Sequence, residues 1–235
     1  VVTANIDIYE RYVQIQTKSS IDAKTIKVLN PKEVVFEGGR ELELDAVSEV
    51  PRYYVCNAYG VCGIYSAPGT AVKGAYDTSG IVTNDRGVTV WLKGNRVSRN
   101  QIMAIKEESV TEQKNSLAVC LDNILRHAGI TRNTEYDLAQ GKTATTILSE
   151  NMTGVQVLDL SGCTLDAVLY YVNQDIPVLA ILEDGEAVLV TGFNEFNVVI
   201  MEPATGKLYK KGMNDATAWF AENGNHFITY MRIEN

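Results

Sequence analysis

Histidine is scarce in this sequence: its 235 residues include only two, His127 and His226. Cysteine is also sparse, with four residues and no pair in a Cys-x-x-Cys arrangement. Structural zinc sites are closed by about four sulfur or imidazole ligands at short spacings, and this inventory does not provide them. We therefore expect no metal and no other cofactor.

Long apolar runs and clusters of positive charge are missing as well. The apolar runs, such as residues 177–182, are far shorter than the roughly 20 residues that cross a bilayer, so no transmembrane segment is expected. The formal net charge is -8 and the basic residues are scattered, which excludes a phosphate-backbone surface and therefore nucleic acid. Hydrophobic residues make up 46% of the chain, enough for a globular core.

No signal peptide is visible at the start of the chain, where residues 1–4 resemble the interior of a sequence. We therefore expect a mature fragment of a longer protein. Residues 1–50 alternate between apolar and polar side chains, which predicts a β-rich segment. Its expected strands lie near residues 6–8, 12–15, 25–28, 33–36 and 41–44, with a hairpin turn at residues 37–40.

Residues 51–100 read as a small α+β unit. Two strand-like stretches flank residues 57–60, and a three-residue loop with Gly60 in the left-handed conformation would set Cys56 opposite Cys62. That pair could form a disulfide, or the two could be small side chains on one face; the pattern leaves both open. A helix is expected around residues 71–76, ending at Gly80, followed by a second hairpin over residues 80–91.

Residues 101–114 form a polar connection to the last domain, residues 115–235. This domain opens with a helix that Asn115 or Ser116 can cap and that Gly129 ends. Further helices are expected around residues 144–148, 164–172 and 215–222, and strands at residues 178–182, 187–191, 198–201 and 226–233. Helices followed by an antiparallel set of strands indicate the α+β class.

Three local signatures in this domain carry a resemblance to a known family. Ser116 opens the first helix, a strand runs from Glu186 to Gly192 and Phe193, and Glu202 with Pro203 follows the next strand. The order resembles the papain-like cysteine peptidases of the bacteriocin-processing (double-glycine) type. In that family a Cys-Gly pair opens the helix, His-Ala starts the strand that ends in Gly and an aromatic residue, and Asp-Pro follows the next strand.

The resemblance implies a papain-like fold for residues 115–235 and assigns each position a role. Ser116 stands where the family has its nucleophilic cysteine, Glu186 where it has the histidine, and Glu202 where it has the aspartate. Gln113 is the nearest candidate for the family's glutamine, which helps form the oxyanion hole. The N-terminal segments resemble those that precede such domains in large secreted proteins of Gram-positive bacteria, which implies an extracellular or cell-surface location.

The residues at these three positions are poorly suited to amide hydrolysis. A serine hydroxyl is a weak acid that depends on an adjacent base, and Glu186 has a reference pKa of only about 4.3. A carboxylate that acidic cannot readily take a proton from an alcohol and return it to an amine near neutral pH. Glu202 beside it would add a like charge instead of orienting an imidazole. We therefore expect degenerate positions and no catalytic residue.

Other cysteines and histidines remain as alternatives. Cys120 could act with His226 as an unusual dyad, although Cys120 lies inside the helix among apolar neighbours, where a thiolate gains little from the helix N-terminus. Cys163 precedes a helix and is best explained as a small residue near a cap. His127, in the last turn of its helix, fits a cation that the helix dipole favours.

Three functions follow from these patterns. The first is a non-catalytic papain-like module that binds a peptide or protein or only packs against neighbouring domains. The alternative is an active cysteine peptidase using a non-standard Cys/His pair. The third is a structural segment of a cell-surface protein, with the N-terminal units as spacer or adhesion surface. No sequence pattern specifies an oligomeric state.

Overall fold

The computed structural model describes residues 26–30, 33–36, 40–42, 51–58, 60, 62–94, 98–102, 105 and 115–233, with the backbone alone for residues 26–42 and for Cys62. The strands expected at residues 6–8 and 12–15 lie outside the described residues, as does most of the turn at residues 37–40. Three strands form an antiparallel sheet in this region: β1 (Ile26–Asn30), β2 (Glu33–Phe36) and β3 (Arg40–Leu42). They correspond to the three other strands expected there.

The small unit is a four-stranded antiparallel sheet with one helix. The sheet has the order β5-β4-β6-β7, made of β4 (Tyr53–Cys56), β5 (Cys62–Tyr65), β6 (Ile81–Asn84) and β7 (Thr89–Leu92). Helix α1 (Pro68–Thr78) contacts β4, β5 and β6. It buries Ala71, Val72 and Ala75 completely, so its apolar residues form the core of the unit.

Two backbone positions define the turns of this unit. Gly60 is left-handed with φ +74°, and Cys56 pairs with Cys62 in the strand register. Cys56 is disulfide-bonded. Helix α1 ends one residue before the expected stop, because Ser79, at φ +53°, and not Gly80 supplies the left-handed residue at the C-cap. The expectation for Gly80 was therefore wrong by one position.

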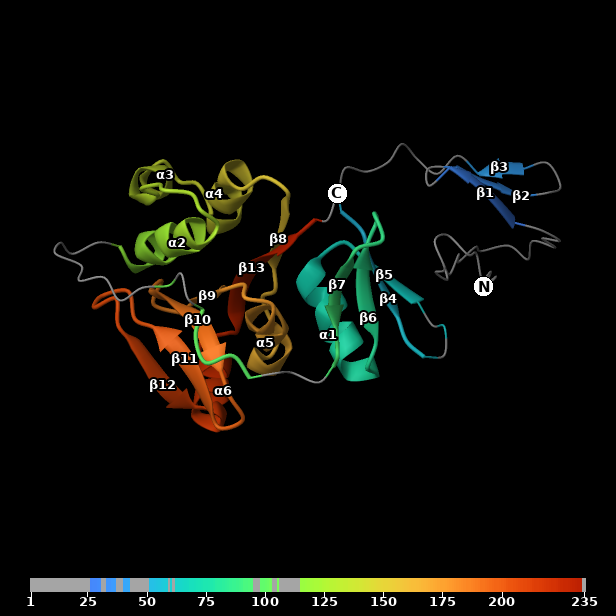
Figure 1. Cartoon of the computed structure of the whole chain (residues 1–235). Coiled ribbons are helices and arrows are strands. Elements are labelled where there is room, and N and C mark those ends of the chain that lie inside the picture. The colour runs from blue at the N-terminus through green and yellow to red at the C-terminus, as the bar shows by residue number, and fades with distance from the viewer. Residues whose placement is uncertain are drawn as a thin grey trace.

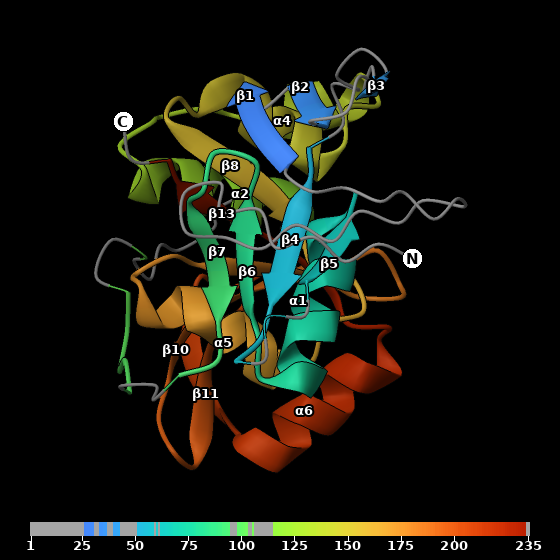
Figure 2. The same ribbon diagram turned by 90° about the vertical axis from the view of Figure 1, so that its right-hand side faces the viewer.

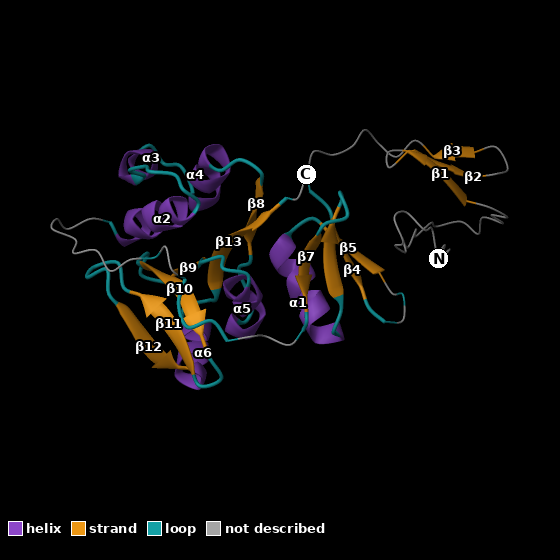
Figure 3. Cartoon of the chain, viewed as in Figure 1, coloured by secondary structure: helices purple, strands orange, loops and turns teal. Residues whose placement is uncertain are grey.

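The C-terminal domain places helices against a six-stranded antiparallel sheet (Figures 1 and 3). The strand order is β12-β11-β10-β9-β13-β8. The strands are β8 (Val155–Asp159), β9 (Val178–Ile181), β10 (Ala187–Phe193), β11 (Asn197–Met201), β12 (Leu208–Gly212) and β13 (His226–Arg232). The helices are α2 (Ser116–His127), α3 (Glu135–Ala139), α4 (Ala144–Asn151), α5 (Leu165–Asn173) and α6 (Met213–Glu222).

Helices cover both faces of this sheet. Helix α2 contacts β9 and β10, and α4 contacts β8. On the other face Phe227 of β13 packs edge-on against Phe220 of α6, with ring centroids 5.2 Å apart. Helix α5 lies between the sheet and the small unit in Figure 1. The core of the domain is therefore two layers of side chains, one on each side of the sheet.

The α+β prediction is confirmed, including helices packed on an antiparallel sheet after a small α+β unit. Three elements were not expected: α3, the edge strand β8 and the edge strand β12. Strand β8 lies between α4 and α5 in the chain, so the helices do not all precede the strands. Both missed strands lie at the edges of the sheet, where one neighbour is enough.

The small unit lies in front of α5 of the C-terminal domain in Figure 2, and we call the surface where the two parts meet the junction. The indole N–H of Trp91 donates to the carbonyl of Ala167 at 2.9 Å, and the Tyr171 hydroxyl donates to the carbonyl of Val90 at 3.1 Å. Trp91 and Tyr171 are both buried, and they belong to one continuous core that extends through both parts. The two parts are therefore held together by buried aromatic residues.

Part of the segment between the two units joins the larger sheet. Arg99 forms a bridge with Phe193 at the end of β10, and the amide of Ile102 donates to the carbonyl of Thr191 at 2.9 Å. Ile102 and Ile105 are completely buried. The described residues of this segment thus extend the pairing of β10 beyond the end of β9.

Candidate functional site

Ser116 is the first residue of α2, and its hydroxyl reaches the start of a distant strand. Asn115 is the N-cap, and its side-chain oxygen accepts from the amides of Leu117 and Ala118 at 2.9 and 3.3 Å. Because Asn115 caps these amides, the Ser116 hydroxyl is not needed as the cap and can bond elsewhere. The amide of Ala187, the first residue of β10, donates to Ser116 Oγ at 3.0 Å. The fold therefore brings positions 116 and 187 together.

Glu186 occupies the turn that enters β10. Its amide donates to Asp184 Oδ1 at 2.9 Å, its carbonyl accepts from the amide of Leu182 at 2.8 Å, and its side chain is exposed. Gly185 takes φ +84° to close this turn. Glu186 thus precedes the residue whose amide reaches Ser116, and it carries a solvated carboxylate where the resemblance expects an imidazole.

Glu202 follows β11 and is engaged within its own turn. Its Oε2 accepts from the Thr205 hydroxyl at 2.8 Å, and its backbone pairs with Lys207 and Gly206. Met201 pairs with Leu189 in the strand register, so Glu202 lies at the same end of the sheet as the start of β10. In the part of the chain that the structure describes, no hydrogen bond or ion pair joins Glu202 to Glu186.

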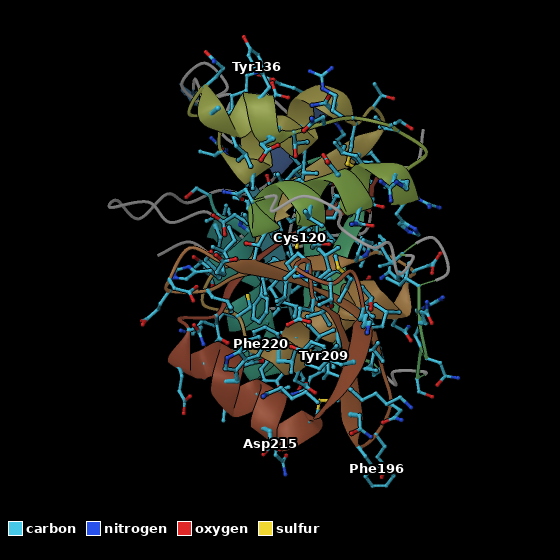
Figure 4. The ribbon with its side chains drawn as sticks, turned by 90° about the vertical axis from the view of Figure 1, so that its left-hand side faces the viewer. Cys120, Tyr136, Phe196, Tyr209, Asp215 and Phe220 are labelled. Atoms are coloured by element: carbon cyan, nitrogen blue, oxygen red, sulfur yellow. The ribbon has the colours of Figure 1, made fainter. Side chains whose placement is uncertain are left out.

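Cys120 lies one turn along α2 and is completely buried (Figure 4). Burial raises the pKa of its thiol far above the ordinary value, and the charge of Glu186 raises it further. Both effects favour the neutral thiol, which is a poor nucleophile. Cys120 is therefore a core residue and not an accessible nucleophile.

His226 lies at the same end of the sheet but on another strand. Ile181 of β9 pairs with both Ala187 and His226, so these two residues are separated by two strand spacings, roughly 10 Å. The side chain of His226 is exposed, whereas that of Cys120 is buried. Among the described residues the two share no hydrogen bond, so the structure does not assemble them into a dyad.

The other sulfur and imidazole groups have structural surroundings. Cys163 is 1% exposed and donates from its Sγ to the carbonyl of Gly69 at 3.3 Å. Burial raises the pKa of this thiol to about 12, while Lys73 lowers it and Asp159 raises it by smaller amounts. His127 ends α2, and its Nε2 lies 2.6 Å from the carbonyl oxygen of Asp175.

Because a carbonyl oxygen only accepts, His127 Nε2 carries the proton in this hydrogen bond. Its other ring nitrogen, Nδ1, is buried without a hydrogen-bond partner. The imidazole thus links the end of α2 to the loop that follows α5. Gln113, the candidate for the oxyanion hole, lies outside the described residues.

Within the described residues, no group of three or more His, Cys, Asp or Glu side chains is arranged to hold a metal ion. None of the helices described there combines the length and the hydrophobicity that crossing a bilayer requires.

The groups at the start of β10 are a hydroxyl, a backbone amide and a carboxylate. These groups can hydrogen-bond a peptide and attract a cation, but none pairs a nucleophile with a neutral base.

The sequence matches no protein-family model and no curated protein. Among solved structures, the chain is similar to the crystal structure of a protein described as a C39-like peptidase from Bacillus anthracis. The TM-score is 0.47 and the sequence identity is 12%, over 60% of this chain and 100% of that chain.

Proposed function

We propose that residues 115–235 form a papain-like domain that binds a peptide or protein segment without cleaving it, within an extracellular or cell-surface bacterial protein. The observation that carries the proposal is the contact between the Ser116 hydroxyl and the amide of Ala187, the residue that follows the exposed Glu186. In the family that the sequence resembles, the thiol opens a helix and the imidazole begins a strand. The two side chains that would react are a serine and a glutamate instead.

Proton chemistry supports binding over hydrolysis. Amide cleavage needs one group that accepts a proton from the nucleophile and returns it to the leaving amine. The ordinary pKa of a glutamate carboxyl, about 4.3, makes the group too weak a base for a serine hydroxyl. The buried thiols of Cys120 and Cys163 stay protonated at neutral pH because burial raises the pKa of each.

The exposed charge of Glu186 suggests the kind of ligand. A segment lying along the start of β10 would meet one carboxylate, one hydroxyl and backbone groups at the helix end. A basic side chain would gain from the carboxylate, by about 0.2 to 1 kcal/mol for an exposed ion pair. We therefore favour peptides that carry lysine or arginine.

The test compares hydrolysis and binding on the same peptides. Fluorescent basic, neutral and acidic peptides are incubated with the protein, and both cleavage and fluorescence anisotropy are measured. We expect no cleavage, preferential binding of the basic peptides, and weaker binding after Glu186→Gln. Glu183→Gln, on the same turn, is the matched control because its side chain is also exposed.

The opposite result would favour the active cysteine peptidase. Cleavage by the native protein that disappears in Cys120→Ala or Cys163→Ala would overturn the proposal. A thiol-reactive probe gives an independent reading at neutral pH. Rapid, stoichiometric labelling of one native cysteine would contradict the burial argument, whereas labelling only after denaturation agrees with it.

A further inference from the structure

An aromatic pocket lies where the small unit meets helix α5, away from the Ser116 site. Its volume is about 240 Å³. We call it the junction pocket; residues of α1, β7, the turn after β7 and α5 line it, among them Tyr76, Trp91, Lys93, Asp166, Tyr170 and Asn173. This volume is smaller than the roughly 300–1,000 Å³ of drug-sized sites, so it suits one head group or one side chain.

Three aromatic rings form the walls of the junction pocket. Trp91 lies between the other two rings, with its centroid 6.1 Å from that of Tyr76 and 6.2 Å from that of Tyr170. The interplanar angles are 51° and 56°, so the neighbouring rings are tilted against each other and do not stack. The faces of aromatic rings are electron-rich, so a pocket lined by several rings can attract a cation.

The charged groups of the pocket agree with this preference. The Tyr76 hydroxyl donates to Asp166 Oδ2 at 3.0 Å, which fixes a carboxylate among the rings. The ammonium of Lys93 lies 4.7 Å from the centroid of the Tyr76 ring and donates to the Tyr76 carbonyl at 3.2 Å. Lys93 is exposed, so its flexible side chain can leave without disturbing the core. An ammonium group from the chain itself thus already uses one wall of the pocket.

We propose that the junction pocket binds an ammonium group of a ligand, in exchange with Lys93. The half-buried rings of Tyr76 and Tyr170 would supply cation–π contacts, with the buried Trp91 packed behind them, and Asp166 would supply the opposite charge. The ligand chemistry is a quaternary ammonium, as in choline, or a primary ammonium, as in a lysine side chain. This site does not depend on whether the Ser116 position is catalytic, so it stands or fails separately from the proposed function.

The indole N–H of Trp91 offers a direct readout by two-dimensional NMR of the ¹⁵N-labelled chain. The sequence has two tryptophans, and Trp219→Phe assigns the two indole signals. Choline chloride, N-acetyl-lysine amide and 3,3-dimethyl-1-butanol are titrated in parallel; the last is the neutral analogue of choline with the same shape. We expect a saturable shift of the Trp91 signal with choline or the lysine derivative, and none with the alcohol. Comparing the two cations identifies which ammonium is preferred.

Substitutions then test the exchange with Lys93. Lys93→Gln removes the resident cation and should tighten binding by about threefold to tenfold, whereas Asp166→Asn should weaken it by a similar factor. Lys211→Gln is the matched control, because its ammonium lies 5.1 Å from the Trp219 ring on α6, and it should change nothing. An equal response to choline and the alcohol, no saturable shift, or weaker binding in Lys93→Gln would overturn the proposal. If Asp166→Asn impairs folding, the change in affinity of the Lys93→Gln variant is the deciding measurement, because Lys93 is exposed.

Discussion

Distant segments meet at the Ser116 site and at the junction, and the two contacts are built in different ways. At the first, a hydroxyl and a backbone amide 71 positions apart share one hydrogen bond between the ends of two elements. At the second, Trp91 reaches 76 positions to Ala167 with a buried indole. The Ser116 site is therefore positioned by the backbone of α2 and β10, so its side chains can be replaced without moving these elements. The junction instead depends on the large side chains themselves.

The strongest test of this comparison is removal of the indole at the junction. Trp91→Ala deletes a buried aromatic side chain and should lower the free energy of unfolding by about 3–5 kcal/mol. Trp91→Phe keeps most of the apolar volume but loses the hydrogen bond to Ala167, and should cost less. Urea denaturation followed by circular dichroism measures both. A loss below about 1 kcal/mol for Trp91→Ala would mean that the junction contributes little.

The two buried thiols, one in each region, sharpen the comparison through pH. The unfolded thiol of Cys163 titrates near pH 8.5, but burial raises its pKa to about 12 in the fold. The folded protein therefore keeps a proton that the unfolded chain releases. The contribution of this thiol to the free energy of unfolding is fully present below about pH 8.5. It is lost as pH rises toward 12, by up to about 1.4 kcal/mol per pH unit.

Urea denaturation at pH 8, 9 and 10, without a reductant so that the Cys56 disulfide stays intact, checks this loss, and Cys163→Ala should make the decline shallower. Cys120→Ala should do the same, because burial also raises the pKa of that thiol. Identical slopes in the native protein and both variants would show that neither thiol is protonated by burial. A change in only one variant would separate the two regions.

Introducing a thiol and an imidazole tests the frame at the Ser116 site. In Ser116→Cys/Glu186→His, a thiol at a helix N-terminus would adjoin an imidazole, which lowers thiol pKa values. A fall from about 8.5 to about 6.5 would raise the thiolate fraction at pH 7 roughly 25-fold. Iodoacetamide labelling rates of the double variant, compared with Ser116→Cys alone, give the measurement. Equal rates would mean that position 186 does not face position 116.

The smallest expected effect is the loss of the serine hydroxyl itself. Ser116→Ala removes the acceptor for the Ala187 amide and should cost about 0.5–1.5 kcal/mol of unfolding free energy. Ser149→Ala on α4, an exposed position, is the control and should be nearly neutral. A larger loss in the control would show that the hydrogen bond at Ser116 has no special role.

Local patterns predicted the elements whose signals are local. Helix α2 was found because Asn115 caps it, its apolar face repeats at helical spacing, and Gly129 at φ +83° ends it. The strand β12 was missed because its lysines, Lys210 and Lys211, lie on an edge strand with little burial. The strand β8 does alternate at Val155 and Val157, and this signal could have revealed it.

The sequence by itself determined which side chains stand at positions 116, 186 and 202, and hence which proton chemistry they can perform, because acidity is first a property of the residue type. Only the tertiary structure decided that Ser116 receives the Ala187 amide and that Cys120 is sealed in the core. It alone also brought Tyr76 and Asp166, 90 positions apart, into one pocket. Such contacts follow from the packing of the whole chain, which no short stretch of residues encodes.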